Sequence, residues 1–121
     1  MLINQSIVYL TTVNIYIMSS IIKLKGKGVS RIINSKVMLS PLAGVTDKIF
    51  RKLVRKWAPD SLLFTEMINA TSLKHGYGTQ KIKQIELEQG PIGVQIFDNR
   101  PFAVSEAAKL AEASGAFLID I

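Results

Sequence analysis

Few of the side chains in this sequence could carry out chemistry. The 121 residues include no cysteine and one histidine, His75, which excludes a disulfide framework, a thiolate metal site, a cysteine nucleophile on this chain and a site built from several histidines. The carboxylates form no metal-ligand pattern without such partners, so we predict no metal site. What remains are small or polar residues that follow short apolar runs: Pro41 to Gly44, Glu66 and Met67, Gln95 to Asp98, and Asp120.

The apolar runs that precede these residues predict parallel strands. They cover residues 36–40, 61–67, 90–97 and 116–121, and helical patterns lie between them. Such alternation, at intervals of about 20 to 30 residues, is typical of βα units. A parallel strand is normally covered on both faces, so a chain ending in one resembles part of a larger fold. We predict an α/β fold, the first half of a TIM (β/α)8 barrel truncated after the fourth strand, with ligands at the C-terminal ends of the strands.

Start and stop signals define the predicted helices at 46–57, 69–76 and 101–115. Thr46 or Asp47 can cap the first, and Pro101 and Gly115 suit the start and end of the last. The first helix has an apolar face that we expect to pack on the barrel as scaffold, formed by Ile49, Phe50, Leu53, Val54 and Trp57. We expect solvent to cover its basic face, formed by Lys48, Arg51, Lys52, Arg55 and Lys56.

The positive charge is concentrated near the N-terminus. The net charge is +6, and no acidic residue precedes Asp47, whereas five basic residues do. A basic excess of this kind favours a polyanion such as nucleic acid or an anionic membrane surface, because binding releases counterions. A lysine-rich loop in contact with solvent explains the charge equally well.

The first seventeen residues, MLINQSIVYLTTVNIYI, allow three interpretations. Polar residues interrupt the run, which makes it a poor membrane span. It also lacks the basic start and the cleavage site of a secretory signal. We favour the third interpretation, in which translation begins at Met18, residues 1–17 are an upstream extension with no role in the fold, and residues 18–121 form the domain.

Four motifs identify a resemblance to a known family. In order and spacing, SPLAGVTDKIFRKL (40–53), LLFTEMINA (62–70), GPIGVQIFDNRP (90–101) and AAKLAEASGAFLIDI (107–121) look like the opening half of the tRNA-dihydrouridine synthases. These enzymes are FMN-dependent barrels that reduce uridine in tRNA to 5,6-dihydrouridine, with NADPH as reductant. The resemblance covers about residues 32–121, and its motifs are in register. Residues 1–17 have no counterpart in the family.

The resemblance implies a flavin site at the strand ends. It assigns Pro41, Leu42 and Ala43 to a segment that lies against the flavin, where an apolar floor and close backbone approach are needed. Without the other motifs, the same segment is an ordinary strand-to-helix turn. The resemblance also assigns Gln95 to a hydrogen bond with the flavin ring. A polar amide between Val94 and Ile96 in a buried strand needs some partner in any case.

Two residues depart from the family pattern, and one matching residue has no assigned role. Leu42 replaces the more common methionine at similar volume, which should be tolerated. Asp98 stands where the family usually has glycine, so the resemblance does not predict the path of the backbone at this position. Glu66 matches a family position but could equally be a structural hydrogen-bond acceptor.

The resemblance implies that the family's catalytic cysteine lies in a motif beyond Ile121, so we assign no catalytic residue and expect this fragment to be inactive alone. We expect tRNA as partner, no membrane association, a monomer when complete, and a cytoplasmic location. Two alternatives stay open: a basic nucleic-acid-binding or non-functional remnant without flavin, and another FMN-dependent barrel oxidoreductase. Flavin absorbance and tRNA binding would separate these alternatives.

Overall fold

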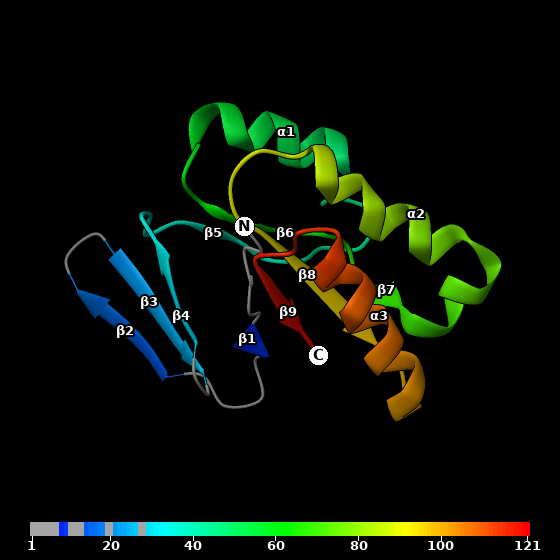
Figure 1. The fold of residues 1–121 in the computed structure, drawn as a ribbon. Helices are drawn as coiled ribbons and strands as arrows, with labels where there is room; N and C mark the ends of the chain where they lie inside the picture. The colour runs from blue at the N-terminus through cyan, green and yellow to red at the C-terminus, as the bar shows by residue number, and fades with distance from the viewer. Residues whose placement is uncertain (1–7, 10–13, 19–20, 27–28) are drawn as a thin grey trace, which may run out of the picture.

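The computed structural model describes residues 8–9, 14–18, 21–26 and 29–121. The strands of its central sheet are all parallel and lie in the order β1-β9-β8-β6-β5 (Figure 1). Four of its strands fall within the predicted runs: β5 (Met38–Leu39), β6 (Leu62–Phe64), β8 (Ile92–Phe97) and β9 (Leu118–Asp120). A short β7 (Ile68–Asn69), which we did not predict, pairs with the end of β8. The fold is therefore mixed α/β with a parallel sheet.

Two predicted helices have the expected bounds. Helix α1 (Lys48–Trp57) begins after Asp47, whose carboxylate accepts a hydrogen bond from the Phe50 N–H at 2.8 Å. Such a cap satisfies one of the amides that have no partner within the helix. Helix α3 (Pro101–Ala113) begins at its proline, and Gly115 follows it with a φ of 87°. A residue with positive φ favours glycine, which explains the stop signal.

The segment between β7 and β8 contains more helix than the sequence indicated. The expected short helix is the 3-10 helix η1 (Ala70–His75), and it is followed by α2 (Tyr77–Lys83) and the 3-10 helix η2 (Gln84–Leu87). The sequence predicts that this helix ends at Gly76. Instead, Gly76 adopts a φ of 83° and turns the chain from η1 into α2. Within residues 29–121, no helix is long and apolar enough to cross a membrane.

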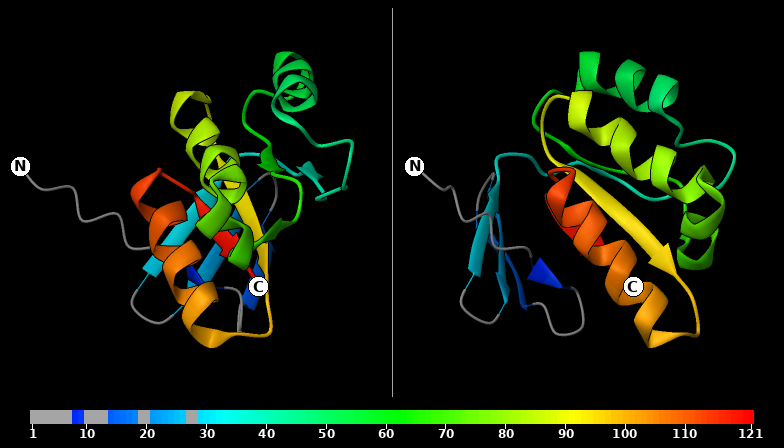
Figure 2. Two further views of the ribbon diagram at one scale, coloured as in Figure 1. Left: turned by 90° about the vertical axis from the view of Figure 1, so that its right-hand side faces the viewer. Right: turned by 45° about the vertical axis from the view of Figure 1, so that its right-hand side comes forward.

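An antiparallel sheet of β2 (Asn14–Met18), β3 (Ile21–Gly26) and β4 (Val29–Ile33) precedes the parallel sheet. In Figure 1 and the right view of Figure 2 it lies on the opposite side of β9 from α2. β1 (Val8–Tyr9) pairs in parallel with β9. Within residues 1–17, positions 1–7 and 10–13 lie outside the described residues, and the interpretation of this segment as an extension stays a prediction.

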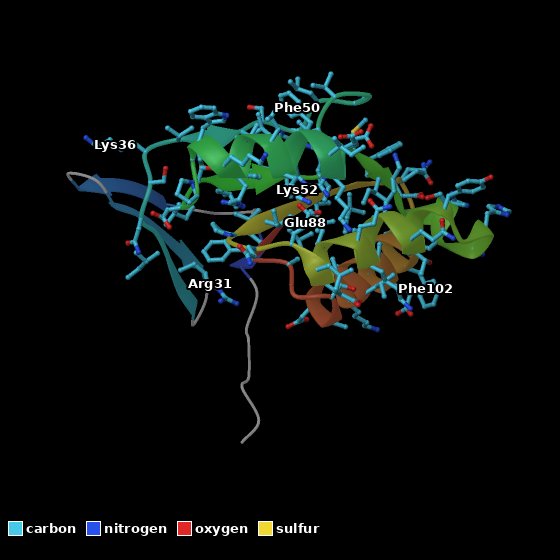
Figure 3. All side chains as sticks on the ribbon, turned by 90° about the horizontal axis from the view of Figure 1, so that it is seen from above. Arg31, Lys36, Phe50, Lys52, Glu88 and Phe102 are labelled. Carbon is cyan, nitrogen blue, oxygen red and sulfur yellow. The ribbon has the colours of Figure 1, made fainter. Side chains whose placement is uncertain are left out.

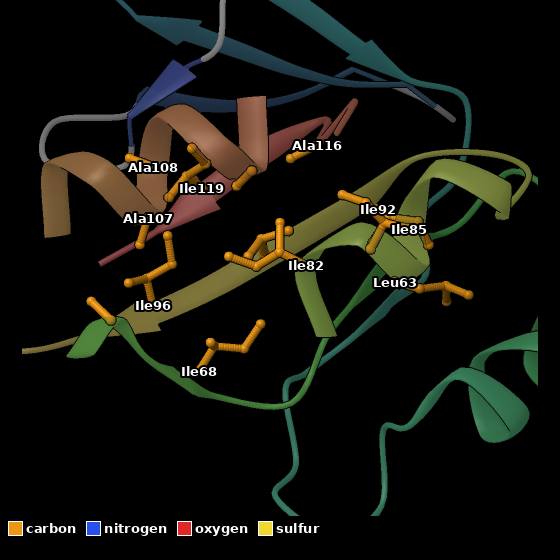
Figure 4. Close-up of a cluster of buried hydrophobic side chains, with 13 residues drawn as sticks. Leu63, Ile68, Ile82, Ile85, Ile92, Ile96, Ala107, Ala108, Ala116 and Ile119 are labelled. Atoms are coloured by element: carbon orange, nitrogen blue, oxygen red, sulfur yellow. The ribbon is translucent and has the colours of Figure 1, made fainter. Parts of the chain in front are cut away.

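Side chains alternate between two faces of the parallel sheet, as strand geometry requires. One face, which we call the outer face, buries Leu63, Ile92, Val94, Ile96 and Ile119 against α2, η2 and α3 (Figure 4). The opposite face of the sheet is the inner face. The helices contribute small or branched residues to this cluster, including Ile82, Ile85, Ala107, Ala108 and Ala111. The alanines of α3 allow the helix to approach the strands closely, so this face is the main hydrophobic core.

The inner face has a second, smaller cluster. Leu62, Phe64 and Leu118 pack there with Ile33, the last residue of β4. Phe64 and Gly93 are paired across β6 and β8, and a Cβ on Gly93 would lie 2.5 Å from the Phe64 ring. The Phe64 ring therefore occupies the space in which any other residue at position 93 would place its side chain.

We expect Gly93→Ala to lower the free energy of unfolding by about 1–3 kcal/mol, because the added methyl overpacks the inner cluster. Urea unfolding measures the loss. Combining Gly93→Ala with Phe64→Leu removes the clashing ring atoms, so the double variant should lose less stability than the two single losses added together. Strict additivity of the two losses would contradict the assigned contact.

Candidate functional site

The C-terminal ends of the parallel strands meet at one edge of the sheet. Residues 41–44 follow β5, Glu66 lies just after β6, and Gln95 and Asp120 lie near the ends of β8 and β9. In open parallel α/β sheets and barrels, ligands bind at this edge. We therefore take the carboxyl edge as the candidate site.

The corner formed by residues 41–44 is fixed by hydrogen bonds to Thr46. The Leu42 N–H donates to Thr46 Oγ1 at 3.0 Å, and the Thr46 hydroxyl donates to the Leu42 carbonyl at 3.1 Å. The Thr46 N–H also donates to that carbonyl, at 2.9 Å. The Thr46 side chain is fully buried, whereas Leu42 is 48% exposed. The corner thus presents an apolar side chain on a rigid backbone.

Glu66 holds the same corner from the neighbouring strand. Its Oε1 accepts from the Gly44 N–H at 2.7 Å, and its Oε2 lies 3.1 Å from Lys81 Nζ in α2. The Gly44 hydrogen bond, and then Lys81, lower the pKa of the Glu66 carboxyl below its ordinary value. Of the two roles that the sequence left open for Glu66, the structure shows a hydrogen-bond acceptor.

A buried ion pair holds helix α1 in place. Arg51 is 3% exposed, and its guanidinium binds both carboxylate oxygens of Glu88, with Nε to Oε2 at 2.9 Å. Arg51 also donates to the Thr46 carbonyl at 2.6 Å. Glu88 therefore acts through Arg51 on Thr46, the residue that positions Leu42.

The expected orientation of α1 is confirmed only for Val54, which packs against the main core, and is wrong for most of the helix. Arg51 is buried and Arg55 is partly buried, although both belong to the face that we expected to be solvated. Ile49, Leu53 and Trp57 of the apolar face are 79%, 52% and 85% exposed. The reason is that Arg51 and Arg55 each find a partner remote in sequence, Glu88 and the Pro91 carbonyl, which turns these two side chains toward the protein.

Gln95 has a partner on the next strand. Its Nε2 donates to Asp120 Oδ2 at 2.6 Å, and its backbone N–H lies 3.3 Å from Thr65 Oγ1. Gln95 and Asp120 are paired across β8 and β9 and are only partly buried. The Gln95 Oε1 makes no hydrogen bond with any residue that the structure describes. This carboxamide therefore has an acceptor oxygen available to a ligand.

The structure brings the sequence-predicted site residues to one edge without joining them directly. Pro41, Leu42 and Ala43 follow β5 and Gln95 belongs to β8, with β6 between the two strands. At about 4.8 Å between adjacent strands, the two groups are roughly 10 Å apart. A flat multi-ring ligand could span this separation, although no hydrogen bond links the two groups within the described chain.

Asp98 ties the end of β8 to η1. Its buried carboxylate accepts from the Thr71 hydroxyl at 2.5 Å and from Arg100 Nε at 2.9 Å. These bonds, that of Arg100 first, hold the pKa of the Asp98 carboxyl well below its usual range. The carboxylate thus faces η1 and Arg100, and these contacts fix the path of the backbone at Asp98.

In the described part of the chain, no group of three or more histidine, cysteine, aspartate or glutamate side chains could hold a metal ion.

Sequence reasoning missed three supports of this site. Thr46 appeared only as a possible helix cap, and nothing in the spacing of Arg51 pointed to Glu88. Asp120 appeared as a strand-end position, and its place opposite Gln95 follows from the register of β8 and β9. A register prediction could have found that pair.

Comparisons with known proteins place the chain among its relatives. A family model described as Dihydrouridine synthase matches residues 38–121. The chain is 45% identical over 89 residues to probable tRNA-dihydrouridine synthase 1 of Synechocystis sp., which covers 74% of this chain and 25% of that protein.

More distant relatives show the same partial coverage. The probable tRNA-dihydrouridine synthase of Rickettsia bellii is 33% identical over 91 residues, covering 74% of this chain and 28% of that protein. The tRNA-dihydrouridine(20/20a) synthase of Escherichia coli (strain K12) is 30% identical over 82 residues, covering 68% and 23%. The chain thus spans about a quarter of the length of these curated relatives.

We expect Arg51→Met to cost about 3–5 kcal/mol of the free energy of unfolding, because it leaves Glu88 buried without a partner. Replacing both residues, as in Arg51→Met with Glu88→Met, should recover much of the loss, since no uncompensated charge remains. Urea unfolding measures both variants, with Lys52→Met on the same helix as the exposed control. Equal losses in the single and double variants would contradict this role for the pair.

The lowered pKa of Glu66 predicts a pH-dependent contribution to stability. The folded-state pKa lies below the unfolded one, so the contribution is present above the ordinary carboxyl pKa of 4.5 and is lost as the pH falls through the folded value. Wild type should exceed Glu66→Gln in stability at neutral pH, and the difference should shrink in acid. Urea unfolding at several pH values tests this, with Glu106→Gln, an exposed pair with Lys109, as control. A pH-independent difference would rule it out.

Proposed function

The chain belongs to the dihydrouridine synthase family, and on that premise we propose that it supplies part of the site in which a flavin-dependent enzyme reduces uridine in tRNA to 5,6-dihydrouridine. The observation that carries this proposal is the carboxyl edge of the sheet, where the Leu42 corner after β5 and the Gln95 carboxamide of β8 lie on either side of β6. The names of the relatives support tRNA as the substrate.

The parallel sheet is, in this proposal, the first half of a (β/α)8 barrel. Its strands β5, β6, β8 and β9 are neighbours in chain order, and helices α2 and α3 cover one face of them. That succession is how a barrel of βα units is built. The face with Phe64, Gly93 and Gln95 would then be the interior, and the helix-covered face the exterior.

The residues at the carboxyl edge fit FMN. Leu42 is apolar, half exposed and rigidly held, and the Gln95 carboxamide offers an acceptor oxygen for a ring N–H. Pro41, Leu42 and Ala43 would lie against the flavin, and Gln95 would bond its ring. When bound and reduced with NADPH, FMN supplies the hydride that saturates the uracil ring.

The chain's own residues would bind and orient rather than transfer protons. Thr46 and Glu66 fix the corner on which the ring would rest, and Asp120 fixes the Gln95 amide. The resemblance implies a cysteine as the proton donor, and the sequence contains none. We therefore propose that these 121 residues are inactive by themselves. As a separate proposal, the whole enzyme is a cytoplasmic monomer.

A chimera tests the proposal. Residues 38–121 would replace the corresponding segment of the Synechocystis relative, and flavin content and dihydrouridine in tRNA would be measured. We expect the chimera to bind FMN and to form dihydrouridine. Gln95→Leu in the chimera should weaken FMN about 2- to 10-fold, the equivalent of one hydrogen bond, and lower dihydrouridine formation with it.

The matched control is Lys83→Gln, an exposed position at the C-terminal end of α2, from which the chain leads back to the start of β8. It should leave flavin content and dihydrouridine unchanged. Full FMN occupancy and undiminished tRNA reduction in the Gln95→Leu chimera would disprove the assignment of Gln95. A folded chimera that binds no flavin would disprove the proposed function.

A further inference from the structure

A basic groove runs along helix α1, away from the strand-end site. It encloses about 530 Å³, with the five basic side chains of α1 on one wall and residues 87–89 on the other. Figure 3 labels Lys52 on the helix and Glu88 on the facing segment, and both residues line the groove. The groove is concave and carries more basic than acidic groups, so an anionic ligand suits it.

The two arginines of the groove are occupied by the fold. Arg51 is paired with Glu88, which neutralises the one carboxylate on the opposite wall. Arg55 donates to the carbonyls of Pro59 at 2.8 Å, Ser61 at 2.6 Å and Pro91 at 3.1 Å. Burial lowers the pKa of Arg55 from its ordinary value. Both guanidiniums are therefore structural.

Three lysines of the groove have no such task. Lys48, Lys52 and Lys56 line the groove and form no ion pair with any residue that the structure describes. They are spaced four residues apart, so their positions repeat about every 6 Å along the helix axis. A row of point charges at this interval is comparable to successive phosphates along one nucleic-acid strand.

We propose that this groove binds the phosphate backbone of the RNA substrate, at a surface separate from the flavin edge. The inference rests on the proposed function, which supplies RNA as the partner. Lysine ammonium groups bind phosphates as point charges and release counterions when they do so. Trp57 lies outside the groove, but it follows Lys56 at the end of α1 and is 85% exposed, so an unpaired base that leaves the groove there can stack on its ring.

An RNA strand fits these observations better than a membrane does. A membrane-bound amphipathic helix inserts its apolar side into a flat interface. The lysines of α1 instead line a groove that has a second wall at residues 87–89. A flexible phosphodiester strand can enter a groove of this kind, whereas a bilayer surface cannot follow it.

The test compares two triple variants of the 121-residue chain with equal net charge. The groove variant removes the three lysine charges of the groove, with Lys48→Gln, Lys52→Gln and Lys56→Gln. The control variant removes three exposed charges elsewhere, with Lys36→Gln, Lys74→Gln and Lys83→Gln. Binding of an unmodified tRNA transcript is measured between about 50 and 200 mM salt. The groove variant should reduce the slope of log K against log salt by about 2–3, and the control variant by much less.

Equal reductions in the two triple variants would overturn the proposal, because net charge alone would explain the binding. So would undetectable tRNA binding by the wild-type chain, or binding to phosphatidylserine vesicles that the groove variant abolishes while tRNA affinity stays unchanged. Lys52→Gln alone, which is the least disruptive change, should lower the slope by about 0.7–0.9.

The outcome separates this inference from the proposed function. A groove-specific change of slope in the chain, together with a folded chimera that binds no flavin, would retain the RNA surface and reject the flavin enzyme. An active chimera whose tRNA binding is unchanged by the three groove substitutions would retain the enzyme and reject the surface. Circular dichroism of each variant confirms that the fold is intact.

Discussion

The buried contact between Arg51 and Glu88 joins the first helix to the segment that leads into β8, and a chain of hydrogen bonds follows from it. Arg51 holds the Thr46 carbonyl, and the Thr46 hydroxyl holds both backbone groups of Leu42. Just after β6, the Glu66 carboxylate accepts a hydrogen bond from the N–H of Gly44 in the same corner. A buried ion pair adds little net stability because both charges lose their hydration, so its main contribution here is geometric. It fixes where the strand-end corner lies.

The same arginine also explains why one helix carries two unlike surfaces. With Arg51 and Arg55 turned inward, the lysines line the groove and the stripe of Ile49, Leu53 and Trp57 faces outward. The two faces of the parallel sheet also differ from each other. Apolar side chains fill the helix-covered face, whereas on the other face of β8 Gly93 makes room for the Phe64 ring and Gln95 places a carboxamide near the strand end. Because successive side chains of β8 point to opposite faces of the sheet, the core-packing residues lie on one face and the candidate ligand-binding residue Gln95 lies on the other.

Much of this fold could be predicted because its signals are local. Apolar runs located β5, β6, β8 and β9, and Pro101 and Gly115 bounded α3. The orientation of α1 was missed because periodicity measures apolarity alone, whereas Glu88 lies 37 residues from Arg51. Helix α2 was missed because glycines usually end helices, yet Gly76 serves here as a joint between two. For the site, the strand-end positions were identifiable, but the partners of Gln95, Glu66 and Asp98 depend on register and on loop packing.

The lengths of the outermost strands have a consequence for how copies of this chain meet. β1 and β5, at the two ends of the parallel sheet, are each two residues long, and Pro41 stands shortly after β5. A strand from another chain adds to a sheet by hydrogen bonding to the unpaired backbone groups of an edge strand. A short edge strand or a proline offers few such groups. The hydrophobic strands β8 and β9 lie inside these edges. The sheet is therefore protected against self-templated aggregation by its own borders.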